Sequence, residues 1–144
     1  MPPLIDGPYG GGNQFAKALK IYFNAQNKYE ENLSNANVVL FNGFPFRERG
    51  SFQKVLEWKV ERGASGIIIV RLDGPISKGR NNPEADYFDC VLYDFCNLVA
   101  DAIVIQSDWS KSEILSHEAA PTCPNYVIGN AVDSKIFFKP KKKK

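Results

Sequence analysis

The sequence predicts an α/β protein whose parallel β-sheet is covered by helices on both faces. Short apolar runs alternate along the chain with longer segments in which apolar residues recur at helical spacing. The short runs are apolar throughout, which is typical of strands that are buried on both faces. Strand–helix–strand order with right-handed crossovers then predicts a Rossmann-like three-layer sandwich with a parallel sheet.

The strands are predicted from compact apolar runs that have turn residues at their ends. Residues 38–42 (VVLFN), 67–70 (IIIV), 102–105 and 126–128 fit this description, and residues 3–5 are a short candidate for a first strand. The run at 67–70 gives the strongest of these signals. A sheet of about five strands is therefore expected.

A glycine-rich loop leads directly into the first predicted helix. Gly7 and residues 10–12 leave backbone N–H groups uncovered just before the helix, whose dipole adds positive potential there. This combination suits a phosphate or another anion. Asn13-Gln14 replace the lysine and hydroxyl residue of a P-loop, and no dinucleotide-binding glycine pattern is present. A strand–turn–helix corner with purely structural glycines is the alternative.

The helices are predicted from apolar spacing and from capping residues. The first helix is predicted to be amphipathic, with an apolar face formed by Phe15, Ala18, Leu19, Tyr22 and Phe23.

The later helices are marked by their ends. Ser51 begins a second helix that Gly63 ends, and Asn82-Pro83 begin a third. Ser110 and Glu113 form a capping-box pattern for a short fourth helix.

The length and composition favour one domain, which is slightly acidic apart from its C-terminal lysines. A chain of 144 residues fits a single domain, and 44% hydrophobic residues are enough for a core. The formal net charge of +2 includes five lysines in residues 139–144, and 18 basic side chains less these five leave 13 against 16 acidic ones. We therefore expect nucleic acid not to be a partner.

Cys90, Cys96 and Cys123 have no metal-ligand spacing and cannot all pair. We expect them to be reduced structural thiols of an intracellular protein, without a metal site. His117, the only histidine, is expected to cap the end of a short helix or to face solvent. The longest apolar runs are too short for a transmembrane segment, and no signal peptide is recognised.

Conspicuous polar and glycine-rich segments leave the carboxyl ends of the predicted strands. In open parallel sheets, ligand sites lie beyond these ends. The segments are residues 7–12, 42–46, 71–75, 107–109 and 130–133. We therefore expect one site along this edge of the sheet.

Three segments resemble the N-terminal half of the GT-B-fold glycosyltransferases of the large group 1, or family 4. They are GGGNQF (residues 10–15), ADAIVIQSDWSKSEIL (100–115) and YVIGNAVDSKIFFKP (126–140), in the order that the family has them. The last is similar to the family's strand followed by Asn-Gly-Val-Asp and Phe-x-Pro, with Ala131 in place of the glycine. Where many members carry a histidine before the central helix, this chain has Arg71-Leu72-Asp73.

The resemblance implies an enzyme, a glycosyltransferase that moves a sugar from a nucleotide-sugar donor to a saccharide or glycolipid acceptor. Residues 1–140 would be its Rossmann-like, acceptor-side domain, and residues 141–144 a lysine tail at the start of the interdomain linker. The donor-binding half of the family follows this point. The 144-residue chain is therefore expected to have little or no activity alone. Either it is a truncated enzyme, or it works with a separate C-terminal half.

The resemblance also implies no metal or other cofactor, since the nucleotide-sugar is a substrate. It implies a cytoplasmic location, with the membrane surface as the alternative. A free-standing Rossmann-like nucleotide- or protein-binding module is the competing function.

Glycosyl transfer places positive charge on the anomeric carbon and negative charge on the leaving diphosphate. The resemblance assigns Gly10, Gly11, Gly12 and Asn13 to the donor phosphates. Asp73 is the catalytic candidate for the acceptor's polar contact or base, and Arg71 for a clamp on an anionic group. A salt-bridged turn at residues 71–75 is the alternative.

Five further residues are candidates for acceptor binding because they leave strand ends and carry polar or aromatic side chains. Caps, turns and packing are the alternative roles for this set. They are Asn42, Ser107, Trp109, Asn130 and Asp133.

Overall fold

The computed structural model describes residue 4 and residues 11–42 and 49–130. Within them the chain forms a four-stranded parallel sheet, so the predicted fold class is confirmed. The strands lie in the order β1 (Val38–Phe41), β2 (Ile67–Leu72), β3 (Ala102–Ile105) and β4 (Asn125–Val127), and each pairs in parallel with the next. Of the candidate strand at residues 3–5, only Leu4 is described.

Five α-helices and three 3₁₀ turns connect the strands in the described ranges. None of these helices is long and apolar enough to cross a membrane. The α-helices are α1 (Gly11–Ala25), α2 (Arg49–Arg62), α3 (Ile76–Gly79), α4 (Asp86–Val99) and α5 (Asp108–Leu115). The 3₁₀ turns are η1 (Leu33–Asn35), η2 (Gly63–Ser65) and η3 (Pro83–Ala85).

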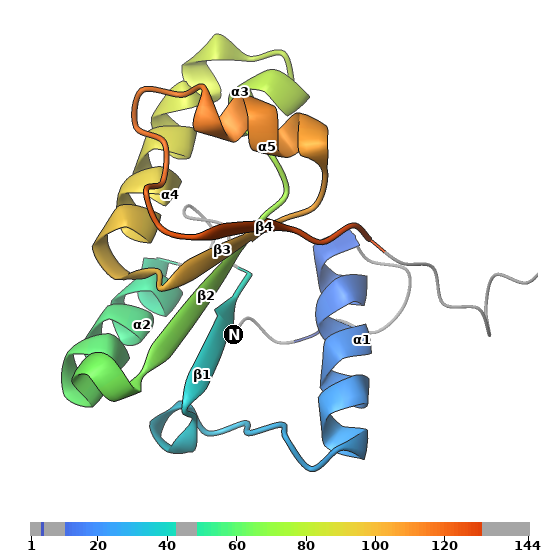
Figure 1. The fold of residues 1–144 in the computed structure, drawn as a ribbon, viewed down its shortest axis with the longest axis vertical. Helices are drawn as coiled ribbons and strands as arrows, with labels where there is room; N and C mark the ends of the chain where they lie inside the picture. Colours follow the sequence, from blue (N-terminus) through green and yellow to red (C-terminus); the bar gives the residue numbers. More distant parts are fainter. Residues whose placement is uncertain (1–3, 5–10, 43–48, 131–144) are drawn as a thin grey trace, which may run out of the picture.

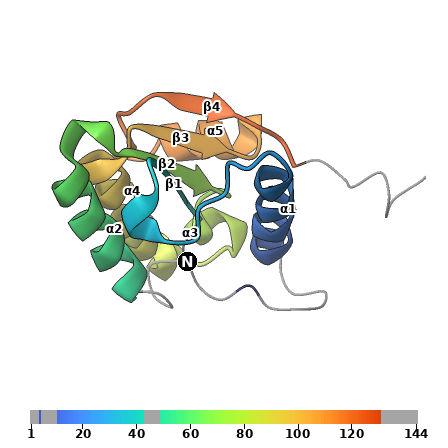
Figure 2. The same cartoon turned by 90° about the horizontal axis from the view of Figure 1, so that it is seen from below.

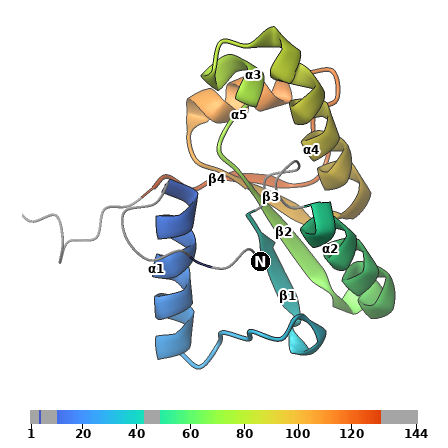
Figure 3. The ribbon, with the colours of Figure 1, turned by 180° about the vertical axis from the view of Figure 1, so that it is seen from behind.

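Helices α2 and α4 pack on one face of the sheet and form the core with it (Figure 1, Figure 3). Three aromatic rings join these layers, one each from β1, α2 and α4. The ring centroids of Phe41 and Phe52 are 4.9 Å apart, and Phe95 lies 5.1 and 4.5 Å from them. Ile68, Val70 and the other inward residues of β2 and β3 complete this core.

Helix α1 lies on the opposite side of the sheet from α2 and α4 (Figure 2). None of its residues is fully buried, and the predicted apolar face is only partly covered. Ala18 is exposed, and so is Tyr22, whose exposed fraction is 57%. The reason is that α1 has no place in the main core, and half-buried residues such as Phe15 make its inner side.

The start of α5 corrects the predicted capping box. Ser107, not Ser110, is the N-cap, and its Oγ accepts the backbone N–H of Ser110 at 3.1 Å. The helix therefore begins at Asp108. Ser107 directly follows the end of β3, and Asp108 places a negative charge in the first turn, which the helix dipole favours.

At the amino-terminal edge of the sheet, Asp101 joins α2 to β2. Its carboxylate accepts hydrogen bonds from Lys59 Nζ at 2.7 Å and from the backbone N–H of Ile68 at 2.7 Å. Burial alone raises the pKa of Asp101, but these partners outweigh burial and hold the pKa below its usual 3.8.

Asp101→Asn should therefore destabilise the protein in a pH-dependent way. At pH 7 the lost charge lowers the free energy of unfolding by about 1 kcal/mol, since the pair is partly exposed. A depressed pKa contributes stability that is lost as the pH falls through the folded-state pKa, so the difference closes below pH 3.8. Urea unfolding at several pH values measures this, with Glu61→Gln as the matched control. A difference that stays constant down to pH 3 would contradict it.

Candidate functional site

The site is centred on Arg71, a charged residue inside the sheet. Ile68, Val70 and Leu72 of β2 belong to the core under α2 and α4, and Arg71 points to the other face, where α1 lies. Its Cζ stands 4.2 Å from the ring centroid of Phe15 in α1, and its side chain is only 4% exposed. Such a burial requires hydrogen-bond partners for the guanidinium.

The partners of Arg71 come from the carboxyl ends of all four strands. Nη1 donates to Asn42 Oδ1 at 3.1 Å, and it pairs with the carboxylate of Asp73. Nη2 donates to Gln106 Oε1 at 3.5 Å and to Asn130 Oδ1 at 3.2 Å. The parallel register of the strands brings these partners together. Phe41 pairs with Val70, so Asn42, which follows Phe41, lies level with Arg71.

The side-chain amides of Asn42, Gln106 and Asn130 also donate hydrogen bonds to other groups. Asn42 Nδ2 donates to the carbonyl oxygen of Gly12 in α1 at 3.4 Å, and Asn130 Nδ2 donates to Gln106 Oε1 at 3.0 Å. Gln106 Nε2 donates to the carbonyl oxygen of Asp73. We call Asn42, Arg71, Asp73, Gln106 and Asn130 the carboxyl-edge cluster.

The turn after β2 is fixed against α5. Ser110 Oγ donates to the carbonyl oxygen of Asp73 at 2.8 Å. Gly74 has a φ of +138°, and a Cβ there would lie 3.0 Å from Ser110 Oγ, so only glycine fits. The turn thereby presents the Asp73 side chain, which is 58% exposed, beside the paired guanidinium.

Four of the predicted site residues therefore meet in one cluster, namely Arg71, Asp73, Asn42 and Asn130. Ser107 does not join them, because its Oγ caps α5. Trp109 lies nearby in the first turn of α5, exposed and close to Gly74.

The predicted phosphate-binding residues lie at the start of α1. Gly11, Gly12 and Asn13 form its first turn, and the Gly12 carbonyl contacts Asn42. Gly10 and Asp133 lie outside the described residues.

Sequence reasoning missed Gln106 and the role of Phe15. The position of Gln106 could have revealed it, because Gln106 is the first polar residue after β3 and directly precedes the predicted Ser107. Phe15 was placed on the apolar face of the first helix, and its contact with the guanidinium of Arg71 was not foreseen.

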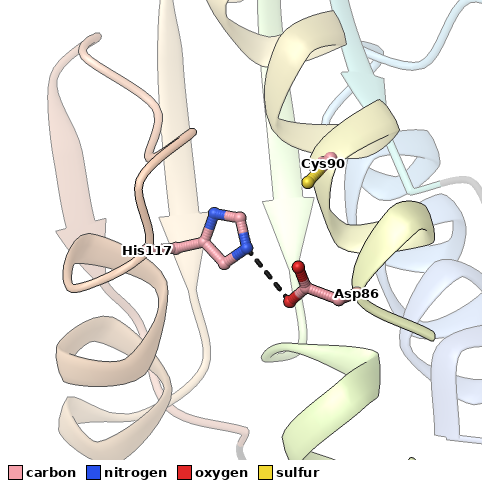
Figure 4. Close-up of side chains that lie close together, drawn as sticks. All are labelled: Asp86, Cys90 and His117. Atoms are coloured by element: carbon pink, nitrogen blue, oxygen red, sulfur yellow. Dashed lines mark hydrogen bonds and ion pairs between the residues drawn. The ribbon is translucent and has the colours of Figure 1, made fainter. Parts of the chain in front are cut away.

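A second group of reactive side chains lies between α4 and the turn after α5. Asp86 and Cys90 belong to α4, and His117 Nε2 lies 3.1 Å from Asp86 Oδ1 (Figure 4). His117 Nδ1 accepts the backbone N–H of Ala119 at 3.0 Å, so this histidine does not simply face solvent.

The surroundings of Cys90 disfavour a thiolate nucleophile. Desolvation and the negative charges of Asp86 and Glu118 raise the pKa of the Cys90 thiol. A reactive cysteine needs the opposite shift. All three cysteines, Cys90, Cys96 and Cys123, are free thiols, as expected.

Comparisons with protein-family models, with curated proteins and with solved structures found no match to this chain. The class of this protein therefore follows from its fold and from the arrangement of its site residues. It is a Rossmann-like α/β protein with a charged and amide-rich cluster at the carboxyl edge of its sheet.

Arg71→Met should loosen both the cluster and α1. Removing the guanidinium leaves Asp73 and three amides without their shared donor, so we expect a loss of about 2–3 kcal/mol in the free energy of unfolding. Backbone amides of α1 should also exchange hydrogen faster, because the Phe15 contact is lost.

Denaturant unfolding and hydrogen exchange measure these two effects. Arg80→Met, at an exposed arginine, is the matched control and should change neither. An Arg71→Met variant as stable as the Arg80→Met variant would show that the cluster does not hold the sheet edge together.

Proposed function

We propose that this chain is the N-terminal, acceptor-side domain of a GT-B-fold glycosyltransferase that uses a nucleotide-sugar donor. The carboxyl-edge cluster carries this proposal, because it gathers three amides and one oriented carboxylate where Rossmann-like sheets hold their ligands. Two of the segments that resemble the family are residues 100–115 and 126–140, and their described parts lead into this edge through β3 and β4.

The chemistry of the cluster suits a ligand that is rich in hydroxyl groups. Carboxylate and amide oxygens accept hydrogen bonds from alcohols, and an amide nitrogen carries two protons. One proton of each amide is used within the described residues, by the carbonyl of Gly12, the carbonyl of Asp73 and Gln106 Oε1. The second proton can serve a sugar hydroxyl, and the exposed ring of Trp109 offers an apolar surface close by.

Asp73 binds the attacking hydroxyl of the acceptor. Its carboxylate is held by Arg71 but more than half exposed, so it has oxygen lone pairs available to an incoming O–H. A negative group at this place also lies near the anomeric carbon, which becomes positive in the transition state. Arg71 acts as a positioning residue, because both of its terminal nitrogens are occupied within the cluster.

The start of α1 faces the donor diphosphate. The carbonyl of Gly12 accepts a hydrogen bond from Asn42, so the first turn of α1 lies beside the carboxyl-edge cluster. A helix N-terminus contributes about 0.3–1 kcal/mol to anion binding, whereas micromolar affinity needs about 8 kcal/mol. The donor therefore takes most of its binding energy from the C-terminal half of the enzyme.

Asp73→Asn should slow catalysis without weakening donor binding. In an enzyme assembled from this chain and a donor-binding half, we expect kcat to fall at least about tenfold, while KM for the donor changes by less than about twofold. The reason is that asparagine cannot take the proton or supply the negative charge. Steady-state kinetics with a radiolabelled donor measure both constants.

Asp94→Asn, at an exposed aspartate of α4, is the matched control for this experiment. Unchanged turnover in Asp73→Asn would reduce Asp73 to a turn residue. A chain that binds nucleotide tightly by itself and gains no activity with a donor-binding half would be a free-standing binding module instead.

Gly11→Val should separate a ligand role of the glycine loop from a structural one. A Cβ at Gly11 meets no atom within 4 Å, so the free energy of unfolding should change by no more than about 0.5 kcal/mol. The added side chain should instead obstruct the donor phosphates and raise the donor KM of the assembled enzyme. Loss of folding would mean that the glycine is structural, and an unchanged KM would remove the phosphate role.

A further inference from the structure

Three side chains with three different metal-binding atoms meet away from the carboxyl-edge cluster (Figure 4). Asp86 and Cys90 are four residues apart on α4 and so lie on the same face of that helix. His117 reaches them from the turn after α5. One carboxylate oxygen, the thiol sulfur and one imidazole nitrogen all lie within 4.8 Å of one another.

We propose that Asp86, Cys90 and His117 bind a divalent transition-metal ion, with Zn²⁺ as the best match. Sulfur, imidazole nitrogen and carboxylate oxygen together are the ligands that zinc takes in proteins. Mg²⁺ and Ca²⁺ prefer sites made of oxygen atoms alone, so Cys90 and His117 disfavour them. Three protein ligands leave one tetrahedral position for water or another ligand.

The surroundings favour a cation and give it access. Asp86 and His117 line an open pocket of about 330 Å³ between α3, α4 and the end of α5. Glu113 and Glu118 also line it, against the single positive side chain of Lys78. The pocket walls therefore carry more negative than positive charge, and an incoming ion or fourth ligand can enter from solvent.

Metal binding requires one local rearrangement at His117. Its Nδ1 accepts the N–H of Ala119, so in the structure described here Nε2 carries the proton and donates it to Asp86. To bind a metal through Nε2, the ring must carry its proton on Nδ1 instead, and the bond from Ala119 must break. Cys90 loses its thiol proton to solvent. Ala119 lies in a turn, so this change stays local.

The experiment uses the whole chain without a histidine tag, freed of metal by a chelator and then titrated with Co²⁺. We expect one equivalent of Co²⁺ to produce a sulfur-to-cobalt charge-transfer band and the visible bands of four-coordinate cobalt. Zn²⁺ should displace the cobalt and remove both signals, and Mg²⁺ should not. These readouts do not depend on glycosyl transfer.

Variants identify the ligands. Cys90→Ser should abolish the charge-transfer band, whereas the matched control Cys123→Ser should keep it. Asp86→Asn and His117→Gln should each weaken the affinity for Co²⁺ by at least about tenfold, since even groups behind the ligands are worth 10–100-fold. Circular dichroism checks that each variant is folded.

Nuclear magnetic resonance on the wild-type chain gives an independent test that needs no variant. His117 is the only histidine, so a single pair of ¹⁵N ring signals, without overlap from other histidines, reports which nitrogen binds Zn²⁺. We expect Nε2 to bind and the Ala119 amide signal to shift as its bond is lost. No charge-transfer band in the wild type, a band that survives Cys90→Ser, or ring signals unchanged by Zn²⁺ would each overturn the proposal.

Discussion

The guanidinium of Arg71 lies where the ends of four strands and the start of one helix meet. It bonds to Asn42 after β1, to Asp73 after β2, to Gln106 after β3 and to Asn130 after β4. The ring of Phe15 from α1 covers it. A buried charge is tolerated only when it is fully paired, so these five elements must hold their relative positions for Arg71 to stay inside.

This constraint connects the fold to the site. The apolar residues of β2 and β3 build the core under α2 and α4, while the opposite face of the sheet carries the polar cluster. Because α1 has no fully buried residue, its place on that face depends strongly on the contacts with Arg71 and Asn42. The same interactions that position α1 also orient the carboxylate of Asp73.

The strands were predictable from sequence because each is a compact apolar run, and only their ends differ by one or two residues. Strand β2 continues through Arg71 and Leu72, where the charge had indicated a strand end. The position of α1 was not predictable, since helical spacing shows which side is apolar but not how deeply it is buried. The cap of α5 was misplaced because Ser107 and Ser110 both fit a capping pattern, and only the chain path out of β3 selects the first.

The carboxyl-edge cluster was largely predictable, because parallel strands bring residues that follow them to one edge. Asn42, Arg71, Asp73 and Asn130 were found in this way, and Gln106 was passed over for its neighbour Ser107. The group of Asp86, Cys90 and His117 was not predictable. Its members come together through packing of α4 against the turn after α5, and no local spacing in the sequence records that contact.

The two tryptophans of the chain occupy contrasting environments. Trp58 is 3% exposed in the core between α2 and the sheet, whereas Trp109 is 55% exposed and lies close to Gly74 at the carboxyl edge. Their fluorescence therefore divides into a blue-shifted signal from the core and a red-shifted signal that soluble quenchers can reach. The first signal would report whether the protein is folded, and the second would respond to a molecule bound at the carboxyl edge, without any attached label.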